Sequence, residues 1–523
     1  MQSNILSTIE NNRLDVISNI DPSHKSSNGQ FMTPVSIGMM MADLFDTPTN
    51  KNIRLLDPGA GTGILIFSFI DMLLRKRIFP KSIDVLAFEN DEYLAKQLEK
   101  NASIATKDYK QQGLNVNINV NEVDFISEGT KLIKPTFDSP NPDFKPFTHV
   151  IANPPYLKIS SSSKERKTLS EIGLQVNNLY SAFIGLSISL LEKGGHLVAI
   201  TPRSFCNGPY FSPFRNFLLN ECSFRSIHLF QSRDSAFKED DVLQENIIYY
   251  LRKGVKESKV CISVSRGRSF TDIKSRTVPH SDIVNVNDRD RIIRIPVNKF
   301  DDYVLERMSI LPCYLSSLGL NVSTGPVVDF RVKKSIFDEA KNGCVPLIYP
   351  SHFKKQSIQW PISKEIKPNA ISVNASTRNW LFPNDHYVLI KRFSSKEERR
   401  RIYPALYNPI VNYKKIAFEN HLNVLHSSKS GIDINVAEGL VSYLSSSIVD
   451  LFFRQFSGHT QVNASDLRSF PFPDHRTIME LSKFYKNGHV ITQNVDDYLE
   501  NLFVSRYSIT SPDPIVLAEK TSP

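Results

Sequence analysis

The sequence predicts an α/β protein whose N-terminal half is a doubly wound sheet. Three observations indicate this fold: an apolar strand over residues 52–57, a glycine-rich turn that follows at once over residues 57–63, and a helix over residues 64–77. Strand, glycine-rich turn and helix form the opening unit of a doubly wound domain, in which ligands bind at the carboxyl ends of the strands. We therefore expect a binding site at the end of this first strand.

The turn carries three alternate glycines, Gly59, Gly61 and Gly63, after Asp57 and Pro58. Glycine lets the backbone approach a ligand closely because it has no side chain. The turn lacks the lysine of a phosphate-binding loop. A glycine-rich turn alone is a weak signal, so the neighbouring strands decide what it binds.

Acidic residues end the next two predicted strands. The strand over residues 83–88 ends at Glu89, which is placed to accept both hydroxyl groups of a ribose. The strand over residues 117–123 ends at Asp124 and Phe125, where a carboxylate can accept from an adenine amine and an aromatic ring can support the base. Any one of these carboxylates could be a solvated strand end, but their recurrence at successive strand tips favours a nucleotide-type ligand.

The segment Asn153-Pro154-Pro155-Tyr156, directly after an apolar run over residues 149–152, is the most informative motif. Proline restricts its own backbone and that of the residue before it, so the backbone of Asn153 and Pro154 is fixed. The Asn153 side-chain oxygen and the Pro154 carbonyl can then face one side together and accept the two hydrogens of an exocyclic amine. Tyr156 can lie flat on the ring that carries this amine. A proline-rich turn with an incidental tyrosine is the alternative.

Alternating elements continue after this motif. A helix over residues 180–191, a strand over 196–201, a helix near 211–219 and strands near 227–230 and 245–251 complete a sheet of about seven strands. This order fits one domain of roughly 230 residues.

The composition is that of an ordinary globular protein. The 523 residues are 41% hydrophobic and 22% charged, and no run reaches the roughly 18 apolar residues of a membrane span. The polar N-terminus lacks an apolar signal core, the five cysteines contain no C-x-x-C pair, and the twelve histidines show no metal-ligand spacing. These features predict a cytoplasmic protein without a metal site.

The net charge is +9, and the excess is unevenly distributed. Residues 1–255 contain 27 Lys and Arg against 27 Asp and Glu, whereas residues 256–523 contain 36 against 27. A neutral half followed by a basic half favours a division between chemistry and polyanion binding. A few surplus surface lysines on an ordinary domain are the alternative.

Two segments of the basic half have features of a nucleic-acid surface. Residues 386–393 alternate like a strand and lead into the basic run 394–401, with aromatic residues interleaved. A solvated helix face is the alternative for residues 396–401. Further on, His459, Gln461 and Asn463 could bond base edges or could brace a loop.

In identity, order and spacing, these motifs resemble the gamma class of N6-adenine DNA methyltransferases, best known from type II restriction–modification systems. The resemblance covers about residues 29–253. It implies that Phe31, Thr33 and Pro34 belong to a leading motif that packs against the methionine end of S-adenosylmethionine, and that Asp57, Gly59, Gly61 and Gly63 belong to the cofactor loop. It further implies that Glu89 is the ribose ligand, that Asp124 and Phe125 bind the cofactor adenine, and that Asn153, Pro154, Pro155 and Tyr156 form the catalytic motif. Phe237 stands where the family places a second aromatic residue against the target base.

The resemblance also implies a domain order. Residues 1–28 would be an N-terminal extension, and residues 29–255 a Rossmann-like, seven-stranded S-adenosylmethionine-dependent methyltransferase domain. Residues 256–475 would be a mixed α+β DNA target-recognition domain, and residues 476–523 a C-terminal helical tail.

The implied activity is that of an adenine-specific, site-specific DNA methyltransferase in the bacterial cytoplasm. Its cofactor would be S-adenosylmethionine, without a metal, and its substrate an adenine flipped out of double-stranded DNA within a short recognition sequence. It would act as a monomer and protect host DNA from a separate cognate restriction endonuclease, since the sequence shows no nuclease motif of its own.

Three alternatives share part of these features. Protein-glutamine methyltransferases also use the Asn-Pro-Pro-Tyr motif on an amide nitrogen, but they are shorter and lack a large basic C-terminal domain. N4-cytosine DNA methyltransferases tend toward serine at the position of Asn153. A DNA-binding subunit with a defunct methylase fold is the third alternative, and the intact Asn153, Tyr156, Asp57 and Glu89 argue against it.

Overall fold

The computed structural model of the chain describes residues 4–19, 32–134, 144–160, 162–230, 245–285, 288, 290–363, 366–394, 398–457 and 460–509. The chain divides into two compact units, Met1–Val297 and Asn298–Pro523. The first unit continues past residue 255, where the sequence suggests a boundary, because two further strands join its sheet.

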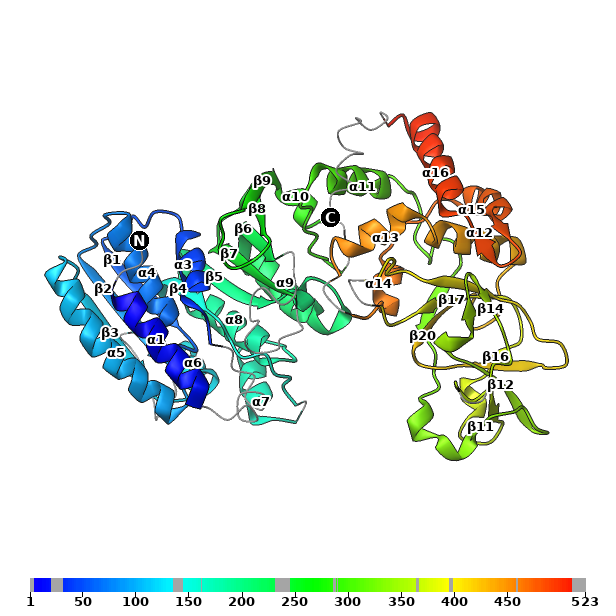
Figure 1. The fold of residues 1–523 in the computed structure, drawn as a ribbon, viewed down its shortest axis with the longest axis horizontal. Helices are drawn as coiled ribbons and strands as arrows, with labels where there is room; N and C mark the ends of the chain where they lie inside the picture. Colours follow the sequence, from blue (N-terminus) through cyan, green and yellow to red (C-terminus); the bar gives the residue numbers. More distant parts are fainter. Residues whose placement is uncertain are drawn as a thin grey trace. The chain divides into compact units, whose positions relative to one another are not determined.

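A nine-stranded sheet forms the centre of the first unit, in the order β3-β2-β1-β4-β5-β7-β6-β8-β9 (Figure 1). The first five strands run parallel, and β7 is antiparallel to both β5 and β6. The predicted doubly wound sheet of seven strands is confirmed, and β8 and β9 extend it beyond β6. The strands are β1 (Asn52–Asp57), β2 (Ser82–Phe88), β3 (Val116–Asn121), β4 (Phe147–Ala152), β5 (Leu191–Pro202), β6 (Cys222–Phe230), β7 (Asn246–Lys253), β8 (Lys259–Ser265) and β9 (Lys274–Pro279).

Helices cover both faces of this sheet and bury a core on each side. Because successive strand residues point to opposite faces, Val150 and Ala152 of β4 join one core and Ile151 joins the other. Helices α6 to α9 contribute to the first core, and α1, α3, α4 and α5 to the second. The helices are α1 (Asn4–Asn19), α3 (Val35–Asp43), α4 (Ile64–Arg75), α5 (Glu92–Gln111), α6 (Phe125–Ile133), α7 (Lys164–Glu171), α8 (Leu179–Leu190), α9 (Ser212–Glu221) and α10 (His280–Ile283).

The parallel direction of the strands brings the predicted motifs to one edge of the sheet. The glycine-rich turn follows β1, Glu89 follows β2, Asp124 closes the connection after β3, and Asn153 follows β4. All of these positions are at carboxyl ends of neighbouring parallel strands, which is where a doubly wound sheet binds its ligands.

The second unit mixes short strands with helices, as the sequence predicts for a mixed α+β unit. Its strands form a six-stranded sheet in the order β10-β20-β17-β18-β14-β13, a five-stranded sheet in the order β11-β15-β12-β19-β16, and the pair β21-β22. Residues from both larger sheets, including Tyr387, Tyr407 and Phe418, join one aromatic core.

The bounds of these elements are as follows. The strands are β10 (Asn321–Thr324), β11 (Ile336–Phe337), β12 (Cys344–Ile348), β13 (Phe353–Lys354), β14 (Ser357–Ile358), β15 (Ala370–Ser372), β16 (Phe382–Pro383), β17 (Tyr387–Lys391), β18 (Pro404–Tyr407), β19 (Lys415–Phe418), β20 (Leu422–His426), β21 (Tyr485–Lys486) and β22 (His489–Val490). The helices are α11 (Lys299–Ser309), α12 (Ile434–Leu444), α13 (Ser447–Arg454), α14 (Ala464–Arg468), α15 (His475–Leu481) and α16 (Thr492–Tyr507).

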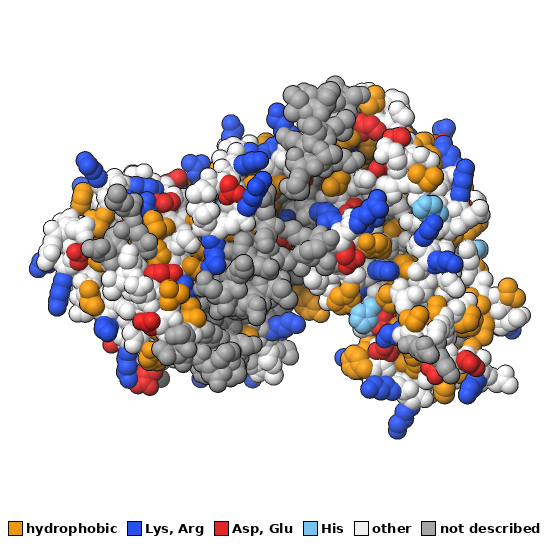
Figure 2. All heavy atoms as spheres, in the orientation of Figure 1, with side chains coloured by type: hydrophobic (Ala, Val, Ile, Leu, Met, Phe, Trp, Pro, Cys, Tyr) orange, Lys and Arg blue, Asp and Glu red, His pale blue; other side chains and the backbone are white. Residues whose placement is uncertain are grey.

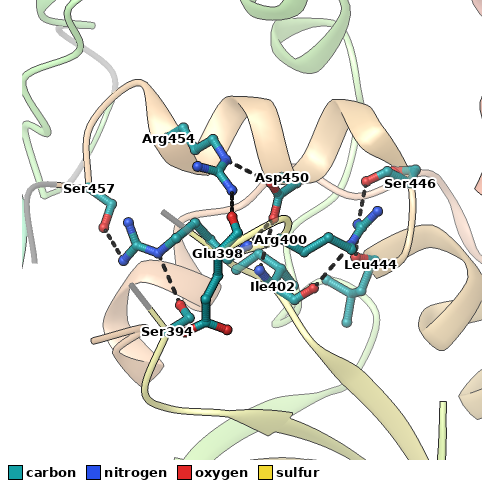
Figure 3. Close-up of polar contacts among 10 residues, drawn as sticks. Ser394, Glu398, Arg400, Ile402, Leu444, Ser446, Asp450, Arg454 and Ser457 are labelled. Carbon is teal, nitrogen blue, oxygen red and sulfur yellow. Dashed lines mark hydrogen bonds and ion pairs between the residues drawn. The ribbon is translucent and has the colours of Figure 1, made fainter. Parts of the chain in front are cut away.

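Two described arginines of the basic run that the sequence suggests as a DNA-facing surface, Arg400 and Arg401, make contacts inside the second unit. Arg401 is 1% exposed, and its guanidinium donates to the hydroxyl oxygens of Ser394 at 3.0 Å and Ser457 at 3.2 Å. The Asp450 carboxylate of α13 accepts from the backbone N–H groups of Arg401 and Ile402 (Figure 3). The prediction of a DNA-facing side chain is therefore wrong for Arg401.

Arg400 also has a structural role. It donates to the carbonyl oxygens of Leu444 and Ser446 at the C-terminal end of α12 (Figure 3), where the helix dipole favours a cation. Of the same run, Arg399 is exposed, and Lys396 lies outside the described residues. Elsewhere Lys and Arg side chains are spread over the visible face of both units rather than confined to one (Figure 2).

Two further features concern the length of the helices and the state of the cysteines. No single described helix is long and apolar enough to span a membrane, and only the bent pair of α12 and α13 meets that test by length and composition together. The five cysteines form no disulfide.

Candidate active site

A cavity of about 320 Å³ lies at the sheet edge where the parallel strands end. Its walls come from the turn after β1, the residues after β2 and β3, the segment after β4 and the first turns of α8. Eight of the residues predicted from the sequence line it: Thr33, Gly59, Gly61, Glu89, Asp124, Phe125, Asn153 and Pro155. Loops that are far apart in the sequence thus share one cavity.

Other predicted residues do not line this cavity. Pro34 is buried and caps the start of α3, and Pro154 is buried between Asn153 and Pro155. Asp57, Gly63 and Tyr156 also lie behind the cavity wall, in the positions described below. Phe31 and Phe237 lie outside the described residues.

The two positive-φ glycines of the turn after β1 have different roles. Gly61 has φ +54°, and a Cβ built on it would meet nothing within 4 Å, so this part of the backbone faces open space in the cavity. Gly63 has φ +92° and caps the start of α4. A Cβ on Gly63 would collide with Phe67 and Leu98, so this glycine is required for close packing rather than for ligand contact.

The Glu89 carboxylate is held in a fixed orientation at the end of β2. Its Oε2 accepts from the Gly61 N–H at 2.8 Å, and its Oε1 accepts from the Asp91 N–H at 3.0 Å. Burial raises the pKa of Glu89 above its ordinary value, and the backbone N–H groups of Asp91, Gly61 and Asn90 act in the opposite direction. Each oxygen keeps a second lone pair, so the carboxylate can still accept from the hydroxyl groups of a diol.

Asp57 is fully buried beneath the glycine-rich turn. Its Oδ1 accepts from the Gly59 N–H at 3.4 Å, while its buried Oδ2 has no hydrogen-bond partner among the described residues. Burial raises the pKa of Asp57 to about 8, the Gly59 N–H lowers it, and the charge of Glu89 raises it further. Asp57 is therefore an incompletely satisfied acceptor next to the cavity wall.

Asp124 and Phe125 form the far wall of the cavity. Asp124 caps the start of α6, because its Oδ2 accepts from the Ser127 N–H at 2.7 Å. Phe125 is buried, with ring centroids 5.1 Å from both Phe88 and Phe183. The cavity thus has an apolar, aromatic wall beside a carboxylate.

The Asn153 side chain is held from both sides. Its Nδ2 donates to Thr33 Oγ1 at 3.0 Å, and its Oδ1 accepts from the Tyr156 hydroxyl at 3.1 Å. These two bonds hold the plane of the amide and place its oxygen beside Tyr156. Asn153 lines the cavity, and its amide oxygen is a hydrogen-bond acceptor with two lone pairs.

Tyr156 has an anchoring role that the sequence did not indicate. Its hydroxyl has two acceptors, Asn153 Oδ1 and, at 3.4 Å, the Ile200 carbonyl oxygen of β5. Its ring is edge-on to Tyr180 with centroids 6.3 Å apart. Burial raises the pKa of Tyr156 well above its ordinary value, so the phenol is a neutral donor.

Sequence reasoning missed two features of this site. Phe183 lines the cavity from α8, but helical spacing marks it only as a core residue. Thr33 was assigned only to the cofactor motif, and its bond to Asn153 joins residues 120 positions apart, which no local pattern could reveal.

These residues fit a nucleoside-type cofactor that carries a cationic group. Asp57 Oδ2 is a buried acceptor with no described partner, Gly61 faces open space, and Glu89 presents an oriented carboxylate. An ammonium group and a ribose diol are donors of the kind that such acceptors bind. Within the described ranges, no group of three or more His, Cys, Asp or Glu side chains is placed to hold a metal ion.

The strand order, the glycine-rich turn and the Asn-Pro-Pro-Tyr segment after β4 define the fold of an S-adenosylmethionine-dependent methyltransferase. Residues 64–237 match the family model described as Eco57I restriction-modification methylase. The chain is 44% identical to Type II methyltransferase M.BsuBI of Bacillus subtilis, over 96% of this chain and 98% of that protein. It is 40% identical to Type II methyltransferase M.PstI of Providencia stuartii, over 92% of this chain and 94% of that protein. The chain therefore belongs to the DNA methyltransferases of type II restriction–modification systems.

A solved structure extends the similarity of fold to both units. The Type IIL restriction-modification enzyme MmeI, in complex with DNA, superposes with a TM-score of 0.54 over 99% of this chain and 76% of that chain. The two sequences are 12% identical, so this similarity concerns the fold alone.

Proposed function

We propose that this protein transfers a methyl group from S-adenosylmethionine to the N6 amine of an adenine that has been rotated out of double-stranded DNA. The observation that carries the proposal is the Asn153 amide, fixed between Thr33 and Tyr156 at the wall of the cavity. A fixed carboxamide oxygen is an acceptor for a planar amine.

In this proposal Asn153 and Pro154 activate the amine. An exocyclic amine on a purine is a poor nucleophile because its lone pair is delocalised into the ring. When Asn153 Oδ1 and the Pro154 carbonyl oxygen accept its two hydrogens, a pyramidal nitrogen with an available lone pair is favoured. Positioning of this kind can supply much of the rate. Neither oxygen is a base, so the proton lost by the methylated nitrogen leaves to water.

Tyr156 receives the target base. The amine is inaccessible within a duplex, so the base must leave the stack, which costs roughly a few kcal/mol. Stacking on an aromatic ring contributes about 1–3 kcal/mol per base in single-strand binders and would offset this cost. We assign Phe237 to the opposite face of the base from its place in the sequence.

The other cavity residues hold the cofactor. When bound, S-adenosylmethionine supplies an electrophilic methyl group on a positively charged sulfur. Glu89 would accept the ribose hydroxyls, and Asp124 would accept the adenine amine beside Phe125. Asp57 would accept the ammonium group, and the segment that includes Phe31, Thr33 and Pro34 would contact the methionine end.

The family supports a role in restriction–modification. The proposed substrate is double-stranded DNA with one short recognition sequence, methylated by a monomer. Methylation of that sequence would protect host DNA from one separate cognate restriction endonuclease.

The test uses the purified chain, tritiated S-adenosylmethionine and plasmid DNA that is digested to nucleosides after the reaction. We expect label in N6-methyl-2′-deoxyadenosine for the parent and none for Asn153→Ala, with cofactor affinity by equilibrium dialysis largely retained. Asn119→Ala, on an exposed position of the edge strand β3, is the matched control and should retain parental turnover. Label in N4-methylcytosine or in protein glutamine would show that cytosine or glutamine, and not adenine, is the substrate. Equal turnover of Asn153→Ala and parent would refute the role of Asn153.

A further inference from the structure

Three loops of the second unit are joined into one frame beside the aromatic core. The Arg392 N–H donates to the His421 carbonyl at 2.9 Å, which continues the ladder between β17 and β20. On the other side, the Val462 N–H donates to the Arg392 carbonyl at 2.7 Å, and Asn423 Nδ2 donates to the Val462 carbonyl at 2.7 Å. The side chains of Arg392, Phe393, His421 and Gln461 come from this frame, and they are called the loop cluster below.

A buried carboxylate orients the imidazole of the loop cluster. Glu419 is 1% exposed, and its carboxylate accepts two described hydrogen bonds, both from His421: from the ring Nδ1 at 2.5 Å and from the backbone N–H at 2.9 Å. Burial of a carboxylate is costly unless donors satisfy it. Here the donors belong to a residue whose own side chain is 49% exposed. Glu419 thus fixes the direction of an exposed ring and leaves its Nε2 for an outside partner.

The other side chains of the loop cluster are also held in position by contacts with their neighbours. Arg392 donates from Nη1 to the Asn420 carbonyl at 3.2 Å and from Nη2 to Gln461 Oε1 at 3.3 Å. Arginine has five N–H donors, so several remain. Phe393 is 43% exposed, and its ring centroid is 4.9 Å from that of His421. A guanidinium, an amide, an imidazole and an exposed phenyl ring are therefore held in fixed mutual positions.

We propose that the loop cluster reads base edges in the major groove of the DNA substrate and so helps to set the recognised sequence. This inference rests on the proposed function, because it takes the substrate to be DNA. Arginine pairs with O6 and N7 of guanine, glutamine pairs with N6 and N7 of adenine, and an apolar side chain contacts the thymine methyl group. Phosphate contacts position a protein without carrying sequence information, whereas oriented amide and imidazole groups suit a directional hydrogen-bond pattern.

Neighbouring polar residues do not offer the same groups. Asn463 accepts from the backbone at the start of α14 and donates to Asp466, so its side chain braces a helix end. Arg401 is buried and donates to Ser394 and Ser457. His459 lies outside the described residues. Of the three residues that the sequence suggests as base readers, only Gln461 is placed by the structure in the loop cluster.

The test compares full-length variants of the loop cluster with the parent. The variants are Arg392→Ala, Gln461→Ala, His421→Ala and Glu419→Gln. Arg476→Ala is the matched control, because Arg476 is a surface arginine of the same unit that is 84% exposed and bonded to Glu480. The motif methylated by the parent is first mapped by sequencing plasmid DNA from an expressing host. Each purified protein then methylates a pool of duplexes with every single-base change in that motif, and its thermal unfolding is recorded.

We expect Arg392→Ala and Gln461→Ala each to lose discrimination at one or two positions of the motif, by about 10- to 100-fold, with parental unfolding temperatures. Glu419→Gln should relax the same position as His421→Ala, since both remove an oriented imidazole. Arg476→Ala should keep the parental motif. A uniform loss of rate on all duplexes with an unchanged motif would identify phosphate contacts, and a lower unfolding temperature with an unchanged motif would identify a structural cluster. Either outcome overturns the inference.

In a second experiment, the duplexes that each protein binds are selected from the same pool. This separates the proposed function from the proposed reading role of the loop cluster. Absence of methylation by the parent overturns the proposed function. Equal base preferences of parent and variants in the selection overturn the reading role, whether or not the parent methylates.

Discussion

Asn153 Nδ2 donates to the hydroxyl oxygen of Thr33 across 3.0 Å, which ties the Asn-Pro-Pro-Tyr segment to a residue 120 positions earlier in the chain. The bond holds the amide in place, with its oxygen turned toward Tyr156. If the amide were reversed, an N–H group instead of an oxygen would face an amine substrate, and the two would repel. Thr33 also lines the cavity, so one side chain stands between the cofactor region and the segment proposed to be catalytic.

Thr33→Val removes this acceptor and keeps the shape of the side chain. We expect kcat to fall about 10-fold, the effect of one lost hydrogen bond of roughly 1.4 kcal/mol, while KM for the cofactor changes less. Thr33→Ser restores the hydroxyl and should restore kcat in steady-state kinetics. If the serine variant were as slow as the valine variant, packing of the threonine methyl group would be the cause.

Asp57 links pH to the stability of the first unit. Burial raises the pKa of Asp57 from 3.8 to about 8. The folded state therefore holds this proton between about pH 4 and pH 8 while the unfolded state has lost it, so the contribution of Asp57 to stability is present at acid pH and is lost as pH rises through this window.

Asp57→Asn does not titrate, which makes it a direct test. By differential scanning calorimetry without cofactor, its unfolding temperature should exceed that of the parent by an increasing margin from pH 5 to pH 8. The pKa shift corresponds to about 4 kcal/mol over this range, so the margin should grow by roughly 10 °C at about 2–4 °C per kcal/mol. The variant should also bind S-adenosylmethionine more weakly. A margin that stays constant with pH would show that Asp57 is charged throughout.

Tyr156 combines an anchoring hydroxyl with the ring proposed to stack on the base. Tyr156→Phe removes the hydroxyl that bonds to Asn153 and Ile200 but keeps the ring, so kcat should fall about 10-fold while base capture persists. Tyr156→Ala should lose capture as well. Fluorescence of 2-aminopurine at the target position measures capture, and equal signals for the two variants would exclude stacking by the ring.

Arg401 is expected to act on the stability of the second unit and not on DNA affinity. Arg401→Ala removes a buried side chain together with its bonds to Ser394 and Ser457, and we expect the second unit to lose about 3 kcal/mol of unfolding free energy. Arg399→Ala, at the exposed neighbouring position, should stay within about 0.5 kcal/mol. Urea unfolding measures both. A loss of DNA binding at unchanged stability would restore the surface role suggested by the sequence.

The first unit was largely predictable because its signals are local. An apolar strand, a glycine turn and a helix lie within 26 residues of one another, and parallel strands bring Glu89, Asp124 and Asn153 to one edge without further information. The roles of Gly63 and Tyr156 were not predictable, because they depend on packing against Leu98 and on a bond to Ile200, both distant in sequence.

The second unit was less predictable for a physical reason. Several of its strands, such as β13 and β16, have only two residues, which is too short for a pattern of alternation. Their partners are distant, as in the pairing of β10 with β20. The basic run around Arg401 likewise gives no sign that some of its charges are buried, because burial depends on α13, which follows it by almost fifty residues.

The frame around Arg392 and His421 is made mostly of peptide groups, so its side chains can change without disturbing the scaffold. A protein built in this way could acquire a new DNA target through one or two substitutions. Under the proposed restriction–modification role, such a change would leave the chromosome open to cleavage by a cognate endonuclease unless that endonuclease shifted its preference in step. The evolutionary constraint would then act on the pair of enzymes and not on the stability of either one.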